Sequence, residues 1–118
     1  MKSIEDRIWA NASKAQVVPY RPVMLDDGCL PRPNCCHDNV KAWVRLHPAD
    51  RRVCGWVILT EGMLAAHSVV ADKAGVLFDI TPIDVDQSRQ RLRFFAHPGD
   101  DTSFDAFAVN HATLIRLA

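Results

Sequence analysis

The 118-residue chain lacks both a long uninterrupted apolar run and an excess of either charge. A helix that spans a bilayer needs about 20 mostly apolar residues, so no membrane-spanning segment is expected. Lysine plus arginine and aspartate plus glutamate each number 14, which leaves no net basic field of the kind that attracts nucleic acid. The sequence therefore predicts neither a membrane protein nor a nucleic-acid-binding protein.

The first residues also lack the apolar stretch of a secretory signal, which predicts a cytoplasmic location. Cysteines in that compartment are expected to be reduced and to act as core, catalytic or metal-binding thiols. A length of 118 residues suits one domain. We expect it to comprise an N-terminal helix and extended arm (1–33), a core of helix and sheet (34–97) and a C-terminal tail (98–118).

Periodicity and turn signals predict an α+β fold, with N-terminal helices packed on an antiparallel sheet of about four strands. The segment between Pro19 and Pro33 holds four prolines and is expected to be extended and irregular. Three helices are expected, one from Ser3 to about Ala12, one over 35–46 with Asn34 as its N-cap, and one capped by Thr102 or Ser103 and running to Val109. Strands are expected over 53–60, 65–71, 76–81 and 92–96, and residues 112–117 suit a strand or a short helix.

The clearest local signal is a hairpin around Gly75. A glycine at the end of a three-residue loop suits a type I turn that closes with a left-handed residue. This loop pairs Asp72 with Val76 and, three residues further on, Val69 with Asp79. His67 and Asp79 then share one face of the hairpin as diagonal neighbours.

Cys36 is the candidate nucleophile. It falls in the first turn of the helix predicted over 35–46, where unpaired amides and the helix dipole favour a thiolate. Its alternative role is a small buried core residue on the apolar stripe that includes Val40 and Trp43. Cys35 competes as nucleophile, but it projects about 100° away from that stripe, so Cys36 is preferred.

His67 and Asp79 are the candidate base and orienting acid. Each interrupts an apolar run, and a buried polar group is costly unless it has a partner. A structural His67–Asp79 pair explains both residues without catalysis. Together with Cys36, however, the same pair forms the nucleophile, base and acid of a cysteine triad.

These motifs resemble a known group of proteins. The segment Cys36-His-Asp-Asn, the segment Ala66-His67-Ser and the segment Phe78-Asp79-Ile-Thr-Pro82 are similar to motifs of small uncharacterised bacterial proteins with a transglutaminase-like or papain-like core. The resemblance covers about residues 34–82 and implies that Cys36 is the nucleophile, His67 the base and Asp79 the orienting acid. It departs from the transglutaminase pattern at Ser68, where an aromatic residue usually follows the histidine.

The function that follows is acyl transfer, or hydrolysis of an amide or ester, through a thioester on Cys36, without a cofactor or a bound metal. The substrate class is a small molecule or a protein partner. One alternative is a catalytically inert binding or accessory module with the same fold, such as a phage-associated protein. Another is a zinc protein that uses cysteines and a histidine, although no compact Cys-x-x-Cys pair is present; its candidate ligands are Cys29, Cys35, Cys36, His37 and Cys54. Three further histidines show no ligand spacing and are expected at the surface or at helix ends, namely His47, His97 and His111.

Overall fold

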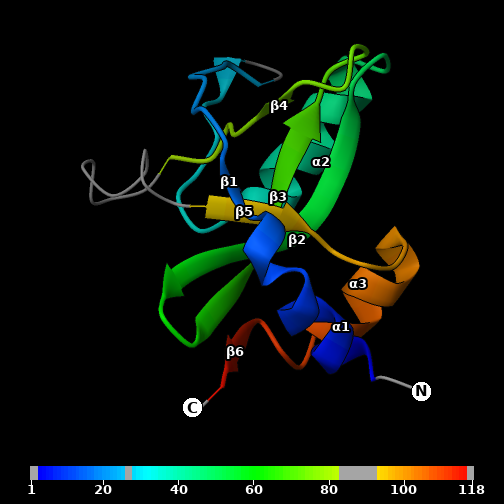
Figure 1. Ribbon diagram of the computed structural model, residues 1–118. Helices are drawn as coiled ribbons and strands as arrows, with labels where there is room; N and C mark the ends of the chain where they lie inside the picture. Colours follow the sequence, from blue (N-terminus) through cyan, green and yellow to red (C-terminus); the bar gives the residue numbers. More distant parts are fainter. Residues whose placement is uncertain (1–2, 26–27, 83–92, 117–118) are drawn as a thin grey trace. The chain divides into compact units, whose positions relative to one another are not determined.

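The computed structural model describes residues 3–25, 28–82 and 93–116 (Figure 1). Within these residues it contains three α-helices, a short 3-10 helix and an antiparallel sheet of six strands. The predicted α+β class is therefore confirmed, and the sheet has more strands than the four expected. The strands follow the order β1-β5-β2-β3-β4, and β6 pairs with β3.

The two strands beyond the four expected are short. The sheet elements have the bounds β1 (Gln16–Val17), β2 (Arg51–Thr60), β3 (Met63–Ala71), β4 (Leu77–Phe78), β5 (Arg93–Ala96) and β6 (Thr113–Ile115). Strand β1 lies in the predicted N-terminal helix and extended arm (1–33), and it is too short to show alternation of apolar and polar residues. Strand β6 settles the open choice for the last segment in favour of a strand, and the end of that segment at Leu117 lies outside the described residues.

The chain forms two compact units. The first unit contains residues 1–17, 54–67 and 92–118, and the second contains residues 18–53 and 68–91. The division into two units does not test whether the chain folds as one domain, so the single domain stays a prediction.

The first unit is built on helices α1 (Ile4–Ala10) and α3 (Asp101–Ala108) together with strand segments. Ser3 caps α1 as predicted, because its side chain accepts a hydrogen bond from the Asp6 amide at 3.1 Å. Asp100, rather than Thr102 or Ser103, caps α3. The buried core of this unit consists of Ile8, Cys54, Trp56, Leu64, Phe95, Phe104 and Leu114.

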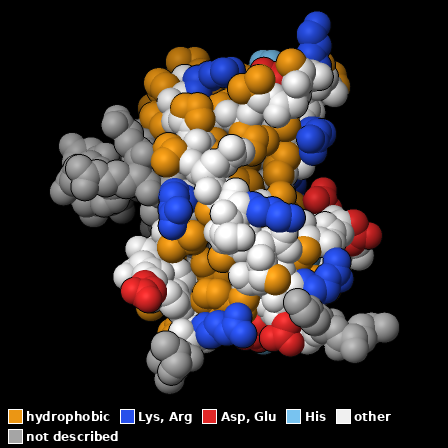
Figure 2. Space-filling model, in the orientation of Figure 1, with side chains coloured by type: hydrophobic (Ala, Val, Ile, Leu, Met, Phe, Trp, Pro, Cys, Tyr) orange, Lys and Arg blue, Asp and Glu red, His pale blue; other side chains and the backbone are white. Residues whose placement is uncertain are grey.

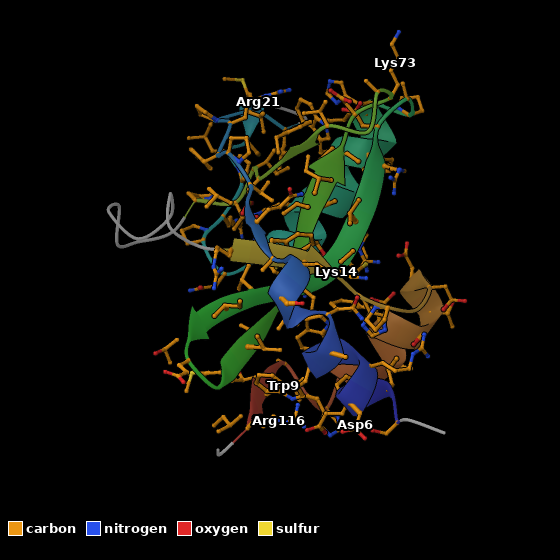
Figure 3. The ribbon with its side chains drawn as sticks, viewed as in Figure 1. Asp6, Trp9, Lys14, Arg21, Lys73 and Arg116 are labelled. Atoms are coloured by element: carbon orange, nitrogen blue, oxygen red, sulfur yellow. The ribbon has the colours of Figure 1, made fainter. Side chains whose placement is uncertain are left out.

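A cation–π contact lies between the N-terminal helix and the C-terminal end of the described chain. A 3-10 helix, η1 (Ala12–Lys14), follows α1, and Trp9 of α1 lies with its ring centroid 5.6 Å from the Arg116 guanidinium (Figure 3). A cation close to an indole ring is attracted by the ring quadrupole. This contact joins α1 to the end of β6.

The second unit is built on helix α2 (Cys36–Leu46) and the hairpin of β3 and β4. Val40 of α2 packs against Val70, Phe78 and Ile80, and all four side chains are fully or almost fully buried. Pro48 follows the helix end at Leu46, as the sequence predicts. The Arg21 guanidinium lies 3.8 Å from the Phe78 ring centroid and covers this core from outside (Figure 3).

The predicted turn of the hairpin is confirmed. Gly75 has a φ of +86°, and its amide donates to the Asp72 carbonyl at 2.8 Å. Val70 pairs with Phe78, and the Asp72 amide donates to the Val76 carbonyl at 3.0 Å. This is the register that the sequence predicts, although β4 is shorter than the segment 76–81.

Candidate functional site

The start of helix α2 differs from the prediction in its cap. Cys35, with φ −119° and ψ 40°, is the N-cap residue and makes no side-chain capping hydrogen bond. Asn34 does not cap the helix, because it adopts a φ of +62°, in the left-handed region that asparagine tolerates better than most residues. Cys36 is then the first residue of the helix, as the candidate nucleophile requires.

Cys36 lies at the helix end where the macrodipole favours negative charge, but its side chain is only 8% exposed. Cys35 is half-buried and Cys29 is exposed. Helix phase therefore separates the two adjacent thiols, with the candidate nucleophile inside and its neighbour closer to solvent.

His37 contacts a serine of the hairpin. Its Nδ1 lies 2.5 Å from the Ser68 hydroxyl oxygen, which links the first turn of α2 to β3. A serine beside a histidine resembles an activated nucleophile. Ser68 is, however, completely buried, so no substrate can reach its oxygen and the contact is structural.

Asp79 has a structural role next to the hairpin. Its carboxylate accepts a hydrogen bond from the Thr81 amide at 3.0 Å. Its backbone forms a parallel bridge with Tyr20, and its amide donates to the Pro19 carbonyl at 2.8 Å. The carboxylate thus has one partner that the sequence did not suggest, in a turn that aspartate commonly forms.

His67 lies in β3 and is 8% exposed. Its ring makes an edge contact with Phe94, with 6.2 Å between the ring centroids. His67 belongs to the first unit, whereas Cys36 and Asp79 belong to the second. The triad of Cys36, His67 and Asp79 accordingly stays a prediction.

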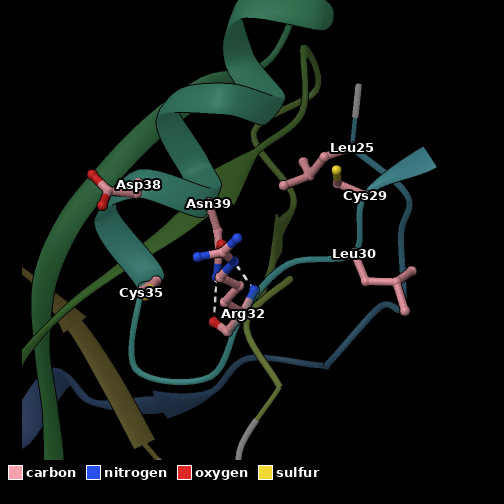
Figure 4. Close-up of a pocket in the computed structure, with 7 residues that line it drawn as sticks. All are labelled: Leu25, Cys29, Leu30, Arg32, Cys35, Asp38 and Asn39. Carbon is pink, nitrogen blue, oxygen red and sulfur yellow. Dashed lines mark hydrogen bonds between the residues drawn. The ribbon is translucent and has the colours of Figure 1, made fainter. Parts of the chain in front are cut away.

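A pocket of about 240 Å³ lies beside the first turn of α2 (Figure 4). The chain segment before the helix and the helix itself line it, with Leu25, Cys29, Leu30, Arg32, Cys35, Asp38 and Asn39. It is Cys35, and not Cys36, that belongs to this lining. The sequence alone gives no sign of the pocket, because its walls meet only in the fold.

Asn39 holds the wall of this pocket in place. The side chain is 4% exposed, and it accepts from the Arg32 amide at 3.1 Å and donates to the Arg32 carbonyl at 2.8 Å. It also donates to the Thr81 hydroxyl at 3.0 Å. A buried amide with these partners fixes the backbone on which the Arg32 side chain stands.

Nothing in the sequence indicated a second polar cluster, in the first unit, because His97 was expected at the surface or at a helix end. That prediction is wrong, since His97 is 7% exposed. Its Nδ1 accepts a hydrogen bond from Trp56 Nε1 at 3.1 Å, and its Nε2 lies 3.2 Å from the Ser103 hydroxyl. An indole N–H can only donate, so Nδ1 carries no proton and His97 is neutral with its proton on Nε2.

The surroundings of His97 agree with a neutral ring. Burial lowers the pKa of His97, and the nearby Arg7 charge lowers it further, against the opposing effect of Asp100 and Asp101. Cys54, opposite on β2, donates its S–H to the Asp101 carboxylate at 3.3 Å. Cys54 and His97 are both buried and hydrogen-bonded within the first unit, so this cysteine–histidine–aspartate group stabilises the fold.

No group of three or more histidine, cysteine, aspartate or glutamate side chains in residues 3–25, 28–82 and 93–116 is arranged to hold a metal ion. None of the helices described is long and apolar enough to cross a membrane. On the face shown in Figure 2, the described lysine and arginine side chains are spread among other residues and do not gather into one patch.

The fold and the polar groups at the start of α2 thus define an α+β protein with a half-buried and a buried cysteine at a helix N-terminus. Comparisons of the chain with protein-family models, with curated proteins and with solved structures find no match.

Proposed function

We propose that this protein is a cysteine-dependent acyl-transfer enzyme or an amide or ester hydrolase with a transglutaminase-like or papain-like core. Cys36 is its nucleophile, His67 its base and Asp79 the acid that orients His67. The observation that carries the proposal is the position of Cys36 as the first residue of α2, where the helix dipole favours a thiolate. The hairpin register also supports it, since Phe78, the residue before Asp79, pairs with Val70 as the sequence predicts.

The chemistry follows from these positions. The Cys36 thiolate adds to a carbonyl carbon, and the amides at the start of α2 are donors for the oxygen on which negative charge develops. Collapse of that intermediate expels the amine or alcohol, which takes a proton from His67, and leaves a thioester. Water or an acceptor then displaces the sulfur and completes the hydrolysis or transfer.

The test is the pH dependence of alkylation at each cysteine, followed by mass spectrometry of the four cysteine peptides after iodoacetamide treatment. We expect the labelling midpoint of Cys36 to lie well below the value of about 8.5 for a free thiol. His67→Gln should move that midpoint upward. The midpoint reports ionisation and the plateau rate reports access, so the burial of Cys36 does not mask the result.

His111→Gln is the matched control, since His111 is exposed and should leave every midpoint unchanged. A Cys36 midpoint no lower than that of the exposed Cys29 contradicts the proposal.

A second candidate is the inert binding or accessory module. Two observations favour it, the burial of Cys36 and the engagement of the Asp79 carboxylate by the Thr81 amide. In such a protein Cys36 is a core residue, so Cys36→Ala would change stability and leave partner binding intact. The same alkylation experiment separates the two candidates.

A further inference from the structure

Two buried polar residues of the second unit take no part in the proposed chemistry. Asn39 is 4% exposed and lies on the first turn of α2, where its backbone amide donates to the Cys35 carbonyl at 2.8 Å. Thr81 is 3% exposed and follows Asp79 by two residues. Because a buried polar group is costly without a partner, the contacts of these two side chains show what they connect.

The Asn39 side chain joins α2 to two other segments. Its Nδ2 donates to the Thr81 hydroxyl oxygen at 3.0 Å and to the Arg32 carbonyl at 2.8 Å, and its Oδ1 accepts from the Arg32 amide at 3.1 Å (Figure 4). A side-chain amide has two N–H donors, and both are engaged. The bond from the Arg32 amide fixes which end of the side chain is the oxygen, so one donor is directed at Thr81.

Thr81 continues this connection to Asp79. The Thr81 amide donates to Asp79 Oδ1 at 3.0 Å. The Asp79 carbonyl also accepts from the Arg21 amide at 2.8 Å, and the Asp79 amide donates to the Pro19 carbonyl at 2.8 Å. A carboxylate can accept from an amide at one oxygen and from a histidine at the other, so the bond from Thr81 is compatible with an orienting acid.

The polar connection runs beside an apolar contact. Val40, the residue after the buried amide, packs against Phe78 and Ile80, which flank Asp79 in sequence. Apolar contacts are not directional and leave two segments free to shift along one another. A hydrogen bond between defined atoms removes that freedom, and a buried polar network with full partners specifies one arrangement.

We propose that Asn39 and Thr81 are positioning residues for the Asp79 carboxylate. They hold it at a fixed place relative to Cys36, the first residue of α2. This inference rests on the proposed function, in which Asp79 orients His67. Without the connection the carboxylate loses the position from which it stabilises an imidazolium, and the thiolate that pairs with the imidazolium is less favoured.

The test is the pH dependence of Cys36 alkylation by iodoacetamide in Thr81→Val. This variant keeps the backbone amide that donates to Asp79 and removes the hydroxyl that accepts from Asn39. We expect the midpoint of Cys36 to rise by about 0.5 pH unit or more. Thr81→Ser keeps the hydroxyl and should retain the midpoint of the parent chain.

Asn39→Ala breaks the same connection from the side of the helix. It should also raise the midpoint of Cys36. The double variant, with Thr81→Val added, should shift the midpoint no further than Asn39→Ala alone, because both changes remove one hydrogen bond. Fully additive shifts would mean that the two residues act separately and would overturn the proposal.

Trp43→Phe is the matched control for a loss of stability. It removes a single hydrogen bond of α2, from Trp43 Nε1 to the Asp50 carboxylate at 2.9 Å, and retains an aromatic ring. The midpoint of Cys36 should not change in this variant. A rise as large as that in Thr81→Val would assign the shift to general loosening of the unit and reject a positioning role.

The parent chain and His67→Gln distinguish this inference from the proposed function. A low parent midpoint that His67→Gln raises and Thr81→Val leaves unchanged retains the proposed enzyme and rejects the positioning role. An ordinary midpoint of Cys36 in the parent chain rejects the enzyme, and the positioning role is rejected with it.

Discussion

Each of the two units has a cysteine near a histidine, but the two pairs differ in burial. In the first unit, Cys54 and His97 are both buried, and their polar atoms contact Asp101, Trp56 and Ser103. In the second unit, Cys35 and His37 are only half-buried; Cys35 lines the pocket beside α2, and His37 contacts the Ser68 hydroxyl. A buried polar group with hydrogen-bond partners stabilises one structure, whereas the half-buried Cys35 lines a pocket.

The largest difference in stability between variants of the two units is expected when a tryptophan is replaced in each of them. Trp56 is fully buried in the first unit, and replacing it by alanine removes that core contact and the hydrogen bond to His97. We expect Trp56→Ala to lower the free energy of unfolding by about 3–5 kcal/mol. Urea unfolding followed by circular dichroism measures this change.

Trp43→Ala is the matched change in the second unit. Trp43 is half-buried, stacks on His47 with 3.7 Å between ring centroids and donates to Asp50 at 2.9 Å. Its removal should cost clearly less than the removal of Trp56. Equal losses in the free energy of unfolding would contradict the expectation that the fully buried Trp56 contributes more than the half-buried Trp43.

The second prediction concerns the amide that supports the pocket. Asn39→Ala removes three hydrogen bonds and leaves the Arg32 amide without its side-chain acceptor. We expect a loss of about 2–3 kcal/mol in the free energy of unfolding. Asn11→Ala, which removes one exposed hydrogen bond at the end of α1, should cost much less in the same urea experiment.

The histidines show why part of the structure could not be predicted from sequence. His97 follows β5, and nothing in its neighbours along the chain announces that α3 and Trp56 will enclose it. Asn39 lies outside the predicted apolar stripe of α2, yet it is buried, because the segment around Arg32 packs on it. A residue that is buried by another segment, and not by its own helix or strand face, leaves no periodic signal in the sequence.

Features set by local chemistry were predicted better. The start of α1 at Ser3, the end of α2 at Leu46 and the Gly75 turn each depend on a few adjacent residues, and all three predictions are confirmed. The prediction that Asn34 caps α2 is wrong, because Asn34 adopts the left-handed conformation. The triad depends on the meeting of residues from different segments, which the sequence alone does not determine.

The third prediction is that the free energy of unfolding decreases at acidic pH because of a histidine in the first unit. The pKa of His97 is lowered in the folded chain from its ordinary value of 6.5, so the unfolded chain binds the proton more readily. Stability should therefore fall as the pH drops below about 6.5, with a slope of at most about 1.4 kcal/mol per pH unit, and level off below the folded pKa. Urea unfolding between pH 7.5 and about 5 measures the slope.

His97→Gln should flatten this part of the pH profile, because glutamine does not titrate. His111→Gln should leave the slope as it is, since His111 is exposed and contacts only its own helix end. Charged groups near His97 are Arg7, Asp100 and Asp101, and the two aspartates oppose the shift. A profile that His97→Gln leaves unchanged would assign the acid sensitivity to other groups.

The smallest effect is expected at the turn that sets the hairpin register in the second unit. Gly75 has a φ of +86°, but no atom lies within 4 Å of the position that a Cβ would take. Gly75→Ala should therefore cost only the strain of a left-handed residue, about 1 kcal/mol. Gly55 is the opposite case in the first unit, because its Cβ would lie 2.1 Å from the Phe95 carbonyl oxygen. No side chain fills the space around Gly75. A loss well above about 1 kcal/mol would therefore mean that alanine shifts the register of the hairpin. Backbone amide exchange in β3 and β4 measures such a shift.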